Sequence, residues 1–244
     1  MTDRGVGQHS LDDDWRDNLI AIGKGVAGAI PLAGGVVSEL IGMIPGQRAD
    51  RIATYLRELA IRVEALDEKV RSALASNPEK MDLIEEGGLQ ASRATSRERL
   101  DQIVEAVSRG LAESDSDVVR RKRLLRVFGE LDDDEVSLLN AYGRSYGGSD
   151  RMAFEKVNRP DPAHLGSSMS VVEDNTLYDA GSAHLLRLGL MKKNYGTVKR
   201  GELPEFDTSK GDFKHRLEVS HFGRMMLRAI GLETPFDASR STHE

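Results

Sequence analysis

The most restrictive feature of this sequence is a stretch of thirteen uncharged residues, Gly25 to Val37, that is rich in glycine and alanine. Six glycines fall between Gly25 and Gly46. Each glycine costs a helix about 1 kcal/mol relative to alanine, so such a run is stable only where close packing or another environment compensates. The stretch must therefore be sheltered by other helices, by a second copy of the chain or by lipid.

Two nucleotide-binding explanations of this stretch are disfavoured. A P-loop ends in a lysine followed by serine or threonine, whereas Lys24 precedes these glycines. Residues 23–28 do match the G-x-G-x-x-G fingerprint of dinucleotide-binding proteins. That motif needs a preceding strand and a surrounding βαβ unit, whereas the segment before it has a helical pattern and no parallel-sheet pattern follows.

A membrane-spanning helix is also disfavoured, because Lys24, Pro31 and Ser38-Glu39 interrupt the apolar segment 19–44 and about 20 continuous apolar residues are needed. The remaining prediction is a helical hairpin whose small residues let backbones approach closely. Either it is buried against the following helix, or it leaves the bundle to enter a membrane or to self-associate. The surface used in the second case would comprise Gly25, Gly28, Ile30, Leu32, Gly34, Gly35, Val36, Val37 and Ile41.

The composition favours a largely helical protein of the cytoplasm. Aromatic residues make up only 5% of the 244 residues, and good helix formers are common. The absence of cysteine excludes disulfides, thiolate metal sites and thiol nucleophiles. Residues 1–17 are polar and acidic, unlike a signal peptide. We therefore expect a cytoplasmic protein, either free or attached peripherally to the inner membrane.

The clearest helical periodicity lies between Arg48 and Ala75. Apolar residues recur there in steps of three and four, which predicts one long amphipathic helix. Its exposed face offers Glu58–Arg62 and Asp67–Arg71 pairs at helical spacing, each contributing about 0.3 kcal/mol. The predicted apolar stripe comprises Ile52, Tyr55, Leu56, Leu59, Val63, Leu66, Val70 and Leu74.

Further helices are expected up to about residue 146. Asn77-Pro78 ends the long helix, and a shorter helix over 79–94 is weakened by the pair Gly87-Gly88. Thr95–Glu98 match a capping box, in which the first and last side chains bond each other's backbone N–H. Asp132 and Glu135 match a second one. The basic segment RRKRLLR, residues 120–126, falls on a helix expected over 118–131.

Beyond Tyr146 the pattern changes. Turn-rich segments flank a short helix expected around 152–157, and Ser170 with Glu173 is expected to cap a helix that ends near Leu188. Strands are expected over 190–196 and 213–219, followed by a closing helix over 220–232. The fold class predicted is mainly α, with an N-terminal helical bundle and a C-terminal α+β domain. The predicted divisions are a polar leader (1–18), a helical domain (19–131), an α+β domain (132–232) and a flexible tail (233–244).

The order of elements after residue 132 resembles a winged-helix domain. AHLLRLGLMKKN ends one helix and begins a strand, and RLEVSHFGRMMLRAIGL carries the second strand into a helix. Ser220-His221-Phe222-Gly223 stands where that family has a Thr/Ser-x-x-Gly helix start. The resemblance implies two strands that form a wing, and a helix before them that enters the DNA major groove in DNA-binding members.

The helix in the recognition position is poorly suited to DNA. Glu173, Asp174 and Asp179 lie in its first half, where carboxylates would face phosphates. A scaffold or partner-docking role is therefore preferred, and a DNA-binding regulator is the alternative. Phosphate or nucleic-acid contacts in that alternative would come from the wing and from the basic segment, namely Lys192, Lys193, Lys199, Arg200, Arg120, Arg121, Lys122, Arg123 and Arg126.

The N-terminal part resembles two groups of helical proteins. A Gly/Ala-rich apolar opening followed by RIATYLRELAIRVEALDEKV is similar to HeLo-like membrane-targeting domains. The order of apolar opening, charged helices and closing helix also resembles bacterial abortive-infection proteins of the Abi-alpha type. These resemblances imply a bacterial defence or stress effector that self-associates or engages a membrane.

No catalytic or metal-ligating constellation is predicted. The six histidines show none of the spacings typical of metal sites, and the acidic runs are explained by helix capping. We therefore expect a non-enzymatic interaction protein with no cofactor and no small-molecule substrate. Its partner is expected to be another protein or a second copy of itself, with a membrane as a further option.

Overall fold

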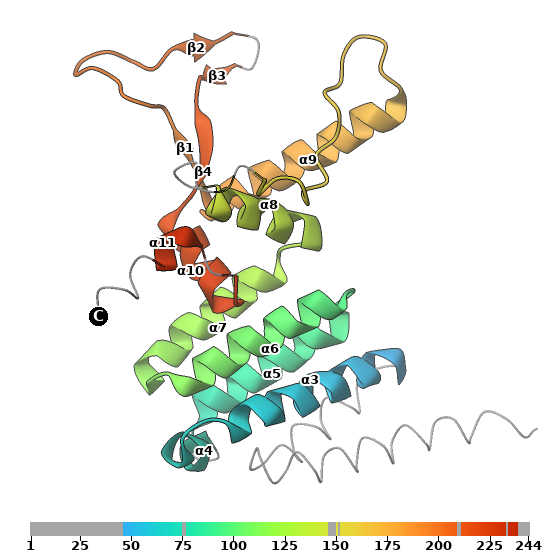
Figure 1. Cartoon of the computed structure of the whole chain (residues 1–244), viewed down its shortest axis with the longest axis vertical. Helices are drawn as coiled ribbons and strands as arrows, with labels where there is room; N and C mark the ends of the chain where they lie inside the picture. The colour runs from blue at the N-terminus through green and yellow to red at the C-terminus, as the bar shows by residue number, and fades with distance from the viewer. Residues whose placement is uncertain are drawn as a thin grey trace, which may run out of the picture. The chain divides into compact units, whose positions relative to one another are not determined.

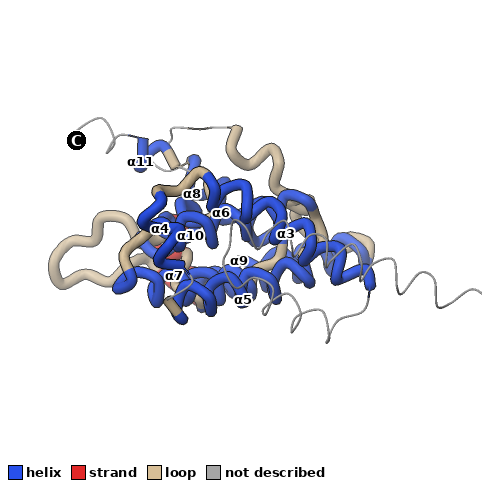
Figure 2. Tube along the Cα trace, turned by 90° about the horizontal axis from the view of Figure 1, so that it is seen from below, coloured by secondary structure: helices blue, strands red, loops and turns tan. Residues whose placement is uncertain are grey.

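A computed structural model describes residues 46–74, 77–145, 150, 152–208, 211–232 and 234–238. The described chain is mainly helical with a small set of strands near its C-terminus, as the sequence predicts (Figures 1 and 2). It divides into two compact units, one on each side of the Gly129–Glu130 bond. None of the described helices is long and apolar enough to cross a membrane. The predicted polar leader and glycine-rich hairpin lie outside the described residues.

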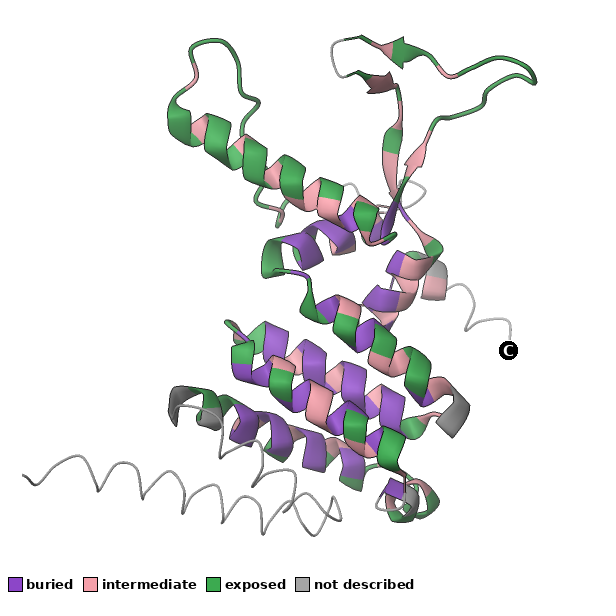
Figure 3. Cartoon of the chain, turned by 180° about the vertical axis from the view of Figure 1, so that it is seen from behind, coloured by how far each residue is buried: buried purple, intermediate pink, exposed green. Residues whose placement is uncertain are grey.

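Helices make up the first unit. They are α3 (Gly46–Glu64), α4 (Glu68–Leu74), α5 (Pro78–Arg93), α6 (Arg97–Ala112) and α7 (Asp115–Gly129). Helix α5 packs against α3, α6 and α7, and buried faces meet between these helices (Figure 3). The apolar stripe predicted along α3 is confirmed, because five of its members are fully buried: Ile52, Tyr55, Leu56, Leu59 and Val63.

The prediction of one long helix over 48–75 is wrong. Helix α3 ends at Glu64, and residues 65–67 form a turn in which Leu66 N–H donates to Val63 O at 3.0 Å. Helix α4 then begins, with Val70 N–H donating to Asp67 O at 2.9 Å. The turn redirects the chain so that α4 contacts α6 and Leu74 is fully buried.

The ion pairs predicted along this segment are replaced by others. Glu58 pairs with Arg97, and Arg62 pairs with Glu105, so both side chains reach α6. Arg71 pairs with Glu68, within α4. Exposed pairs of this kind contribute at most about 1 kcal/mol each, so burial of the apolar stripe dominates the packing of α3.

Helix α5 runs without interruption through Gly87-Gly88, which were expected to weaken it. Its start is stabilised by Asn77, whose Oδ1 accepts from Glu79 N–H at 3.0 Å. A Cβ at Gly87 would lie 2.7 Å from Val107 Cγ2 and closer still to Tyr55 Oη. That hydroxyl donates to Ile84 O at 3.0 Å, and burial raises the pKa of the phenol. Glycine at this position therefore makes room for a buried tyrosine.

Helix α6 begins one residue later than the capping box predicted at Thr95–Glu98 requires. The N-cap of α6 is Ser96, whose Oγ accepts from Arg99 N–H at 3.1 Å. The Arg99 guanidinium lies 3.8 Å above the Phe128 ring and donates to Phe128 O at 2.7 Å. This contact connects α6 to the end of α7, and the Arg99 side chain that makes it is buried.

The second unit combines helices with a hairpin. Its helices are α8 (Asp133–Arg144), α9 (Met169–Arg187), α10 (His221–Ala229) and α11 (Pro235–Ala238). Its strands are β1 (Met191–Asn194), β2 (Phe206–Asp207), β3 (Asp212–Phe213) and β4 (Arg216–Val219). Antiparallel β1 and β4 pair with Met191 opposite Val219, and β2 and β3 pair farther along the same hairpin. Helix α8 contacts α9, β4 and α10, which places the core of the unit at the base of the hairpin.

Several predictions for this unit need correction. Residues 152–156 form turns instead of a short helix, held in place by packing of Phe154 on Tyr142 with ring centroids 5.0 Å apart. Helix α9 is capped by Ser168, not by Ser170. The second predicted strand is divided at residues 214–215 into β3 and β4.

The junction between α9, β1 and α10 is tightly packed. Gly189 adopts a positive φ of 73° and ends α9, as the sequence predicts. Ser220 caps α10, with Oγ accepting from Gly223 N–H at 2.9 Å and donating to Gly189 O at 2.6 Å. A Cβ at Gly223 would lie 2.9 Å from Val219 Cγ2 and closer still to Leu190 O. The Ser-x-x-Gly pattern thus joins a cap to a close backbone approach.

Part of the predicted flexible tail is folded. Helix α11 follows Thr234, which is buried, and Asp237 Oδ2 accepts from Thr234 Oγ1 at 2.7 Å. Asp237 also accepts from Arg228 of α10 at 2.8 Å. These bonds fix α11 to the preceding helix. The resemblance of this unit to winged-helix domains stays a prediction.

Candidate functional site

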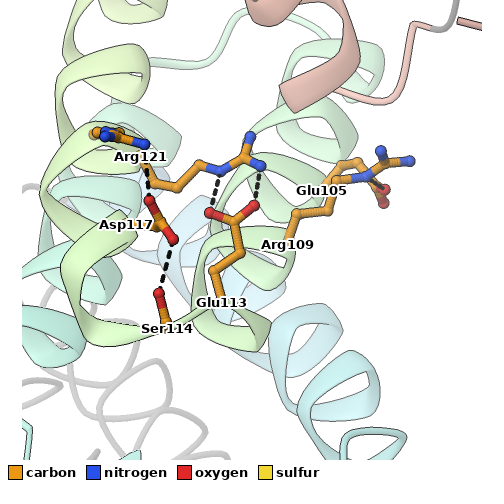
Figure 4. A network of polar contacts seen from close by, with 7 residues as sticks. Glu105, Arg109, Glu113, Ser114, Asp117 and Arg121 are labelled. Carbon is orange, nitrogen blue, oxygen red and sulfur yellow. Dashed lines mark hydrogen bonds and ion pairs between the residues drawn. The ribbon is translucent and has the colours of Figure 1, made fainter.

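Most cations of the basic segment on α7 pair with carboxylates of their own unit. Arg121 donates through Nε to Glu113 Oε2 at 2.8 Å and through Nη2 to the other oxygen of the same carboxylate (Figure 4). Arg120 donates to Asp117 Oδ1 at 3.0 Å, and Ser114 donates to Asp117 Oδ2 at 2.7 Å. Arg120 and Arg121 therefore each already have a carboxylate partner at this corner of α6 and α7.

The remaining cations of the segment follow the same pattern. Lys122 Nζ lies 2.5 Å from Asp82 Oδ2, and Arg126 Nε lies 3.4 Å from Glu86 Oε2, both on α5. Arg123 is exposed and has no acidic partner among the described residues. Four of the five cations in this segment thus already have a carboxylate partner, and a phosphate would have to compete with that partner.

The predicted wing cations divide into two groups. Lys192 Nζ lies 3.7 Å from Glu218 Oε2, and Lys193 forms an ion pair with Asp212. The hydrogen bond between Lys193 and Asp212 raises the pKa of the lysine and lowers the pKa of the carboxyl. Lys199 and Arg200, in contrast, are exposed in the loop between β1 and β2 and have no acidic partner within the described ranges.

The hairpin also carries a small aromatic cluster. Phe213 meets the rings of Phe206 and Tyr195 edge to face, with centroids 5.4 and 6.5 Å away. His215 lies 5.9 Å from Tyr195. Phe206 and Tyr195 are exposed, so part of this cluster faces solvent. Its edge-to-face contacts stabilise the outer half of the hairpin, where only two residues of each strand are paired.

A groove lies between α8, residues 157–160 and α9. Its volume is about 530 Å³. Apolar walls come from Leu138 of α8 and Leu177 of α9, with Val157 between them. Carboxylates from both helices also line it, so the groove combines apolar and acidic side chains. Its lining includes Asp132, Asp134, Glu135, Asp174, Tyr178 and His184.

Glu135 connects the two helices that form the groove. Its Oε2 accepts from Asp132 N–H at 3.0 Å, and Asp132 Oδ1 accepts from Glu135 N–H at 2.7 Å, which confirms the predicted capping box. Its Oε1 lies 2.7 Å from Nδ1 of His184 on α9. Because Glu135 is buried, this hydrogen bond lies in a medium that strengthens it.

The other two carboxylates of the groove differ from Asp132 and Glu135. Asp134 and Asp174 line it from α8 and α9, and neither has an ionic partner in the part of the chain that the structure describes. Leu177 is 71% exposed although it is a large apolar residue. Burial raises the pKa of Tyr178, and the nearby Arg159 charge opposes this rise. The groove therefore offers two free negative charges beside an uncovered leucine.

Sequence reasoning did not find this groove. Asp132 and Glu135 were predicted only as caps, and His184 was considered only as one of six histidines without the spacing of a metal site. Their pairing joins positions 49 residues apart, and no spacing rule connects them. The described residues bring together no three side chains suited to hold a metal ion.

Comparison with known proteins and structures identifies no relative of this chain. The chain matches no protein-family model, no curated protein and no solved structure. The function must therefore be argued from the surfaces of the described units. The nine residues predicted for self-association or membrane contact lie outside the described part of the chain, and they are Gly25, Gly28, Ile30, Leu32, Gly34, Gly35, Val36, Val37 and Ile41.

The capping box makes a first testable prediction. Asp132→Ala removes the acceptor for Glu135 N–H and is expected to lower the free energy of unfolding of the second unit by about 1 kcal/mol. Urea denaturation followed by circular dichroism measures this change. The matched control is Ser137→Ala, which removes an exposed hydroxyl of the same helix and should change stability by less than about 0.5 kcal/mol. Equal effects of the two substitutions would contradict the capping role.

Proposed function

We propose that this chain is a non-enzymatic interaction protein whose second unit docks a protein partner along α9. The observation that carries the proposal is the exposure of α9. Of its 19 residues only Leu185 is buried, whereas Met169 and Leu177 are 72% and 71% exposed (Figure 3). The predicted glycine-rich segment 19–44 would add a surface for self-association or for a membrane, in keeping with a bacterial defence or stress effector.

The physical argument concerns the stability of α9 itself. Most helical stability in proteins comes from packing of an apolar face rather than from the helix propensity of the residues. Helix α9 buries little on its own unit and exposes apolar side chains that gain about 25 cal/mol for each Å² removed from water. A partner that covers Leu177 and the adjoining groove supplies this missing burial, which favours docking as the function.

Site-specific photo-crosslinking in cells tests the docking function. A photo-reactive amino acid replaces Leu177 on α9 or, as a matched control, Ile61 on α3, which is 63% exposed. Discrete protein adducts are expected from position 177 and not from position 61. Adducts of the chain with itself would identify a homo-oligomer. The absence of any adduct specific to position 177 would contradict the proposal.

The membrane part of the proposal has a separate test. Flotation with liposomes is compared for the full chain and for a variant that lacks residues 19–46. We expect the full chain to float with the liposomes and the shortened chain to remain at the bottom. Equal flotation of the two proteins would exclude the glycine-rich segment as a membrane anchor.

A DNA-binding regulator is the second candidate, favoured by one observation, the exposure of Lys199 and Arg200 in the hairpin loop. Against it stand Glu173, Asp174 and Asp179, all exposed on α9. If this candidate is correct, duplex binding will fall steeply with salt and the charge reversals Lys199→Glu and Arg200→Glu will abolish it. Undetectable binding at low salt would remove this candidate.

A further inference from the structure

We propose that the groove between α8 and α9 binds a basic, apolar segment of a different protein. A lysine or arginine of that segment pairs with Asp134 or Asp174, and a neighbouring apolar side chain covers Leu177 and Leu138. This inference rests on the proposed docking function and names the chemistry of the partner. It is carried by the juxtaposition of two free carboxylates with an uncovered apolar wall in one groove.

The charges of the groove select a cation. Four carboxylates line it, and two of them already have bonds: Asp132 accepts from the backbone of Glu135, and Glu135 accepts from His184. Asp134 and Asp174 keep their charges for a ligand. His184 also lines the groove and bonds to Glu135, and the positive charge of Arg159 acts on Tyr178, another residue of the lining. A phosphate would be repelled here, whereas a lysine or arginine side chain would be attracted.

The apolar walls select more than a charge. Leu138 of the groove lining is buried, whereas Leu177 on α9 is largely exposed. A free metal ion would leave Leu177 in water, whereas an apolar residue next to the bound cation would cover it. Peptide segments that alternate basic and apolar residues combine both contacts, as amphipathic segments do in other grooves.

The basic segment of this same chain is not the occupant. On α7, Arg121, Lys122 and Arg126 already pair with carboxylates of their own unit. Its apolar residues Leu124 and Leu125 are buried. Docking it into the groove of a second copy would require α7 to leave its unit. The structure therefore favours a segment of another protein.

Binding of a defined peptide tests the inference. The probe is a fluorescently labelled twelve-residue peptide of arginine and leucine in amphipathic order, and its matched counterpart carries glutamate in place of arginine. Fluorescence anisotropy is measured with the full chain at low and at moderate salt. We expect the arginine peptide to bind with an affinity that falls as salt rises, and the glutamate peptide not to bind.

Two double variants separate the groove from general attraction to an acidic protein. Asp134→Asn with Asp174→Asn removes the free charges of the groove, and about a fivefold to tenfold loss of affinity is expected. The matched control, Glu173→Gln with Asp179→Asn, changes the net charge equally at exposed positions that do not line the groove. Its affinity should stay within about twofold of the unchanged protein.

A third variant tests the apolar contact. Leu177→Ser is expected to weaken binding of the arginine peptide by about threefold, because it removes most of the apolar area of an exposed side chain without a charge change. Together, loss in the groove double variant and in Leu177→Ser, with retention in the matched control, supports the inference.

Other outcomes overturn it. Equal losses in the two double variants would mean attraction to overall charge, and no binding of the arginine peptide would mean that the groove does not take this chemistry. Loss in Leu177→Ser alone would mean docking without selection for a cation, which leaves the proposed function standing. Crosslinking at position 177 decides that function independently of the peptide.

Discussion

Gly223→Ala is expected to destabilise the second unit by about 3 kcal/mol, at the upper end of the effects of overpacking. The added methyl group would overlap the carbonyl oxygen of Leu190, and its next neighbour would be Val219 Cγ2 at 2.9 Å. A flexible side chain could move aside, but Leu190 O belongs to the backbone and accepts from Ser220 N–H at 2.9 Å. Relief therefore requires α10 to shift away from β1, which breaks this bond.

Gly181→Ala on α9 provides the matched control. Its Cβ would lie 3.4 Å from Glu135 Cγ, an ordinary contact, and alanine favours a helix by up to about 1 kcal/mol over glycine. We expect a neutral or slightly stabilising effect. Urea denaturation measures both variants, and hydrogen exchange of the α10 amides places the loss in the second unit. A Gly223→Ala protein as stable as the unchanged chain would show that the α10–β1 contact is looser than described.

Gly87→Ala is expected to destabilise the first unit by about 2 kcal/mol. The methyl group would meet the buried Tyr55 hydroxyl and Val107 Cγ2, and the better helix propensity of alanine recovers only about 1 kcal/mol of that strain. Tyr55 has no free space to enter, because it is fully buried and its hydroxyl bonds Ile84 O. The loss is measured by the same urea denaturation.

A double-mutant cycle identifies the cause. Tyr55→Phe removes the oxygen nearest to the added methyl group, so Gly87→Ala should cost less in the Tyr55→Phe background than in the unchanged chain. A coupling of at least about 0.5 kcal/mol is expected for groups in contact. Additive effects would mean that the strain lies against Val107 instead of Tyr55.

Local patterns in the sequence predicted local features of the structure. The apolar stripe of α3 follows from helical periodicity, and the Asp132–Glu135 capping box joins residues three positions apart. The C-terminal end of α9, predicted near Leu188, and the start of α10 at Ser220 were also predicted. Each of these features depends on neighbours within one or two turns, and for that reason the sequence reveals them.

Features set by distant residues were missed or misjudged. The turn at 65–67 depends on contact between α4 and α6, and no breaking residue marks it. Gly87 was judged a weakness of its helix, but its role depends on Tyr55 in another helix. The groove could not be foreseen, because it lies between α8 and α9, and the Glu135–His184 hydrogen bond that joins these helices links positions 49 residues apart.

The shared use of Glu135 has a mechanical consequence. One carboxylate accepts from Asp132 N–H at the start of α8 and also bonds His184 in the last part of α9. Any force that draws α9 outward would strain the first turn of α8 as well, since both helices depend on the same two oxygens. A ligand bound in the groove that shifts Glu135 would therefore affect the start of α8 and the last part of α9 together.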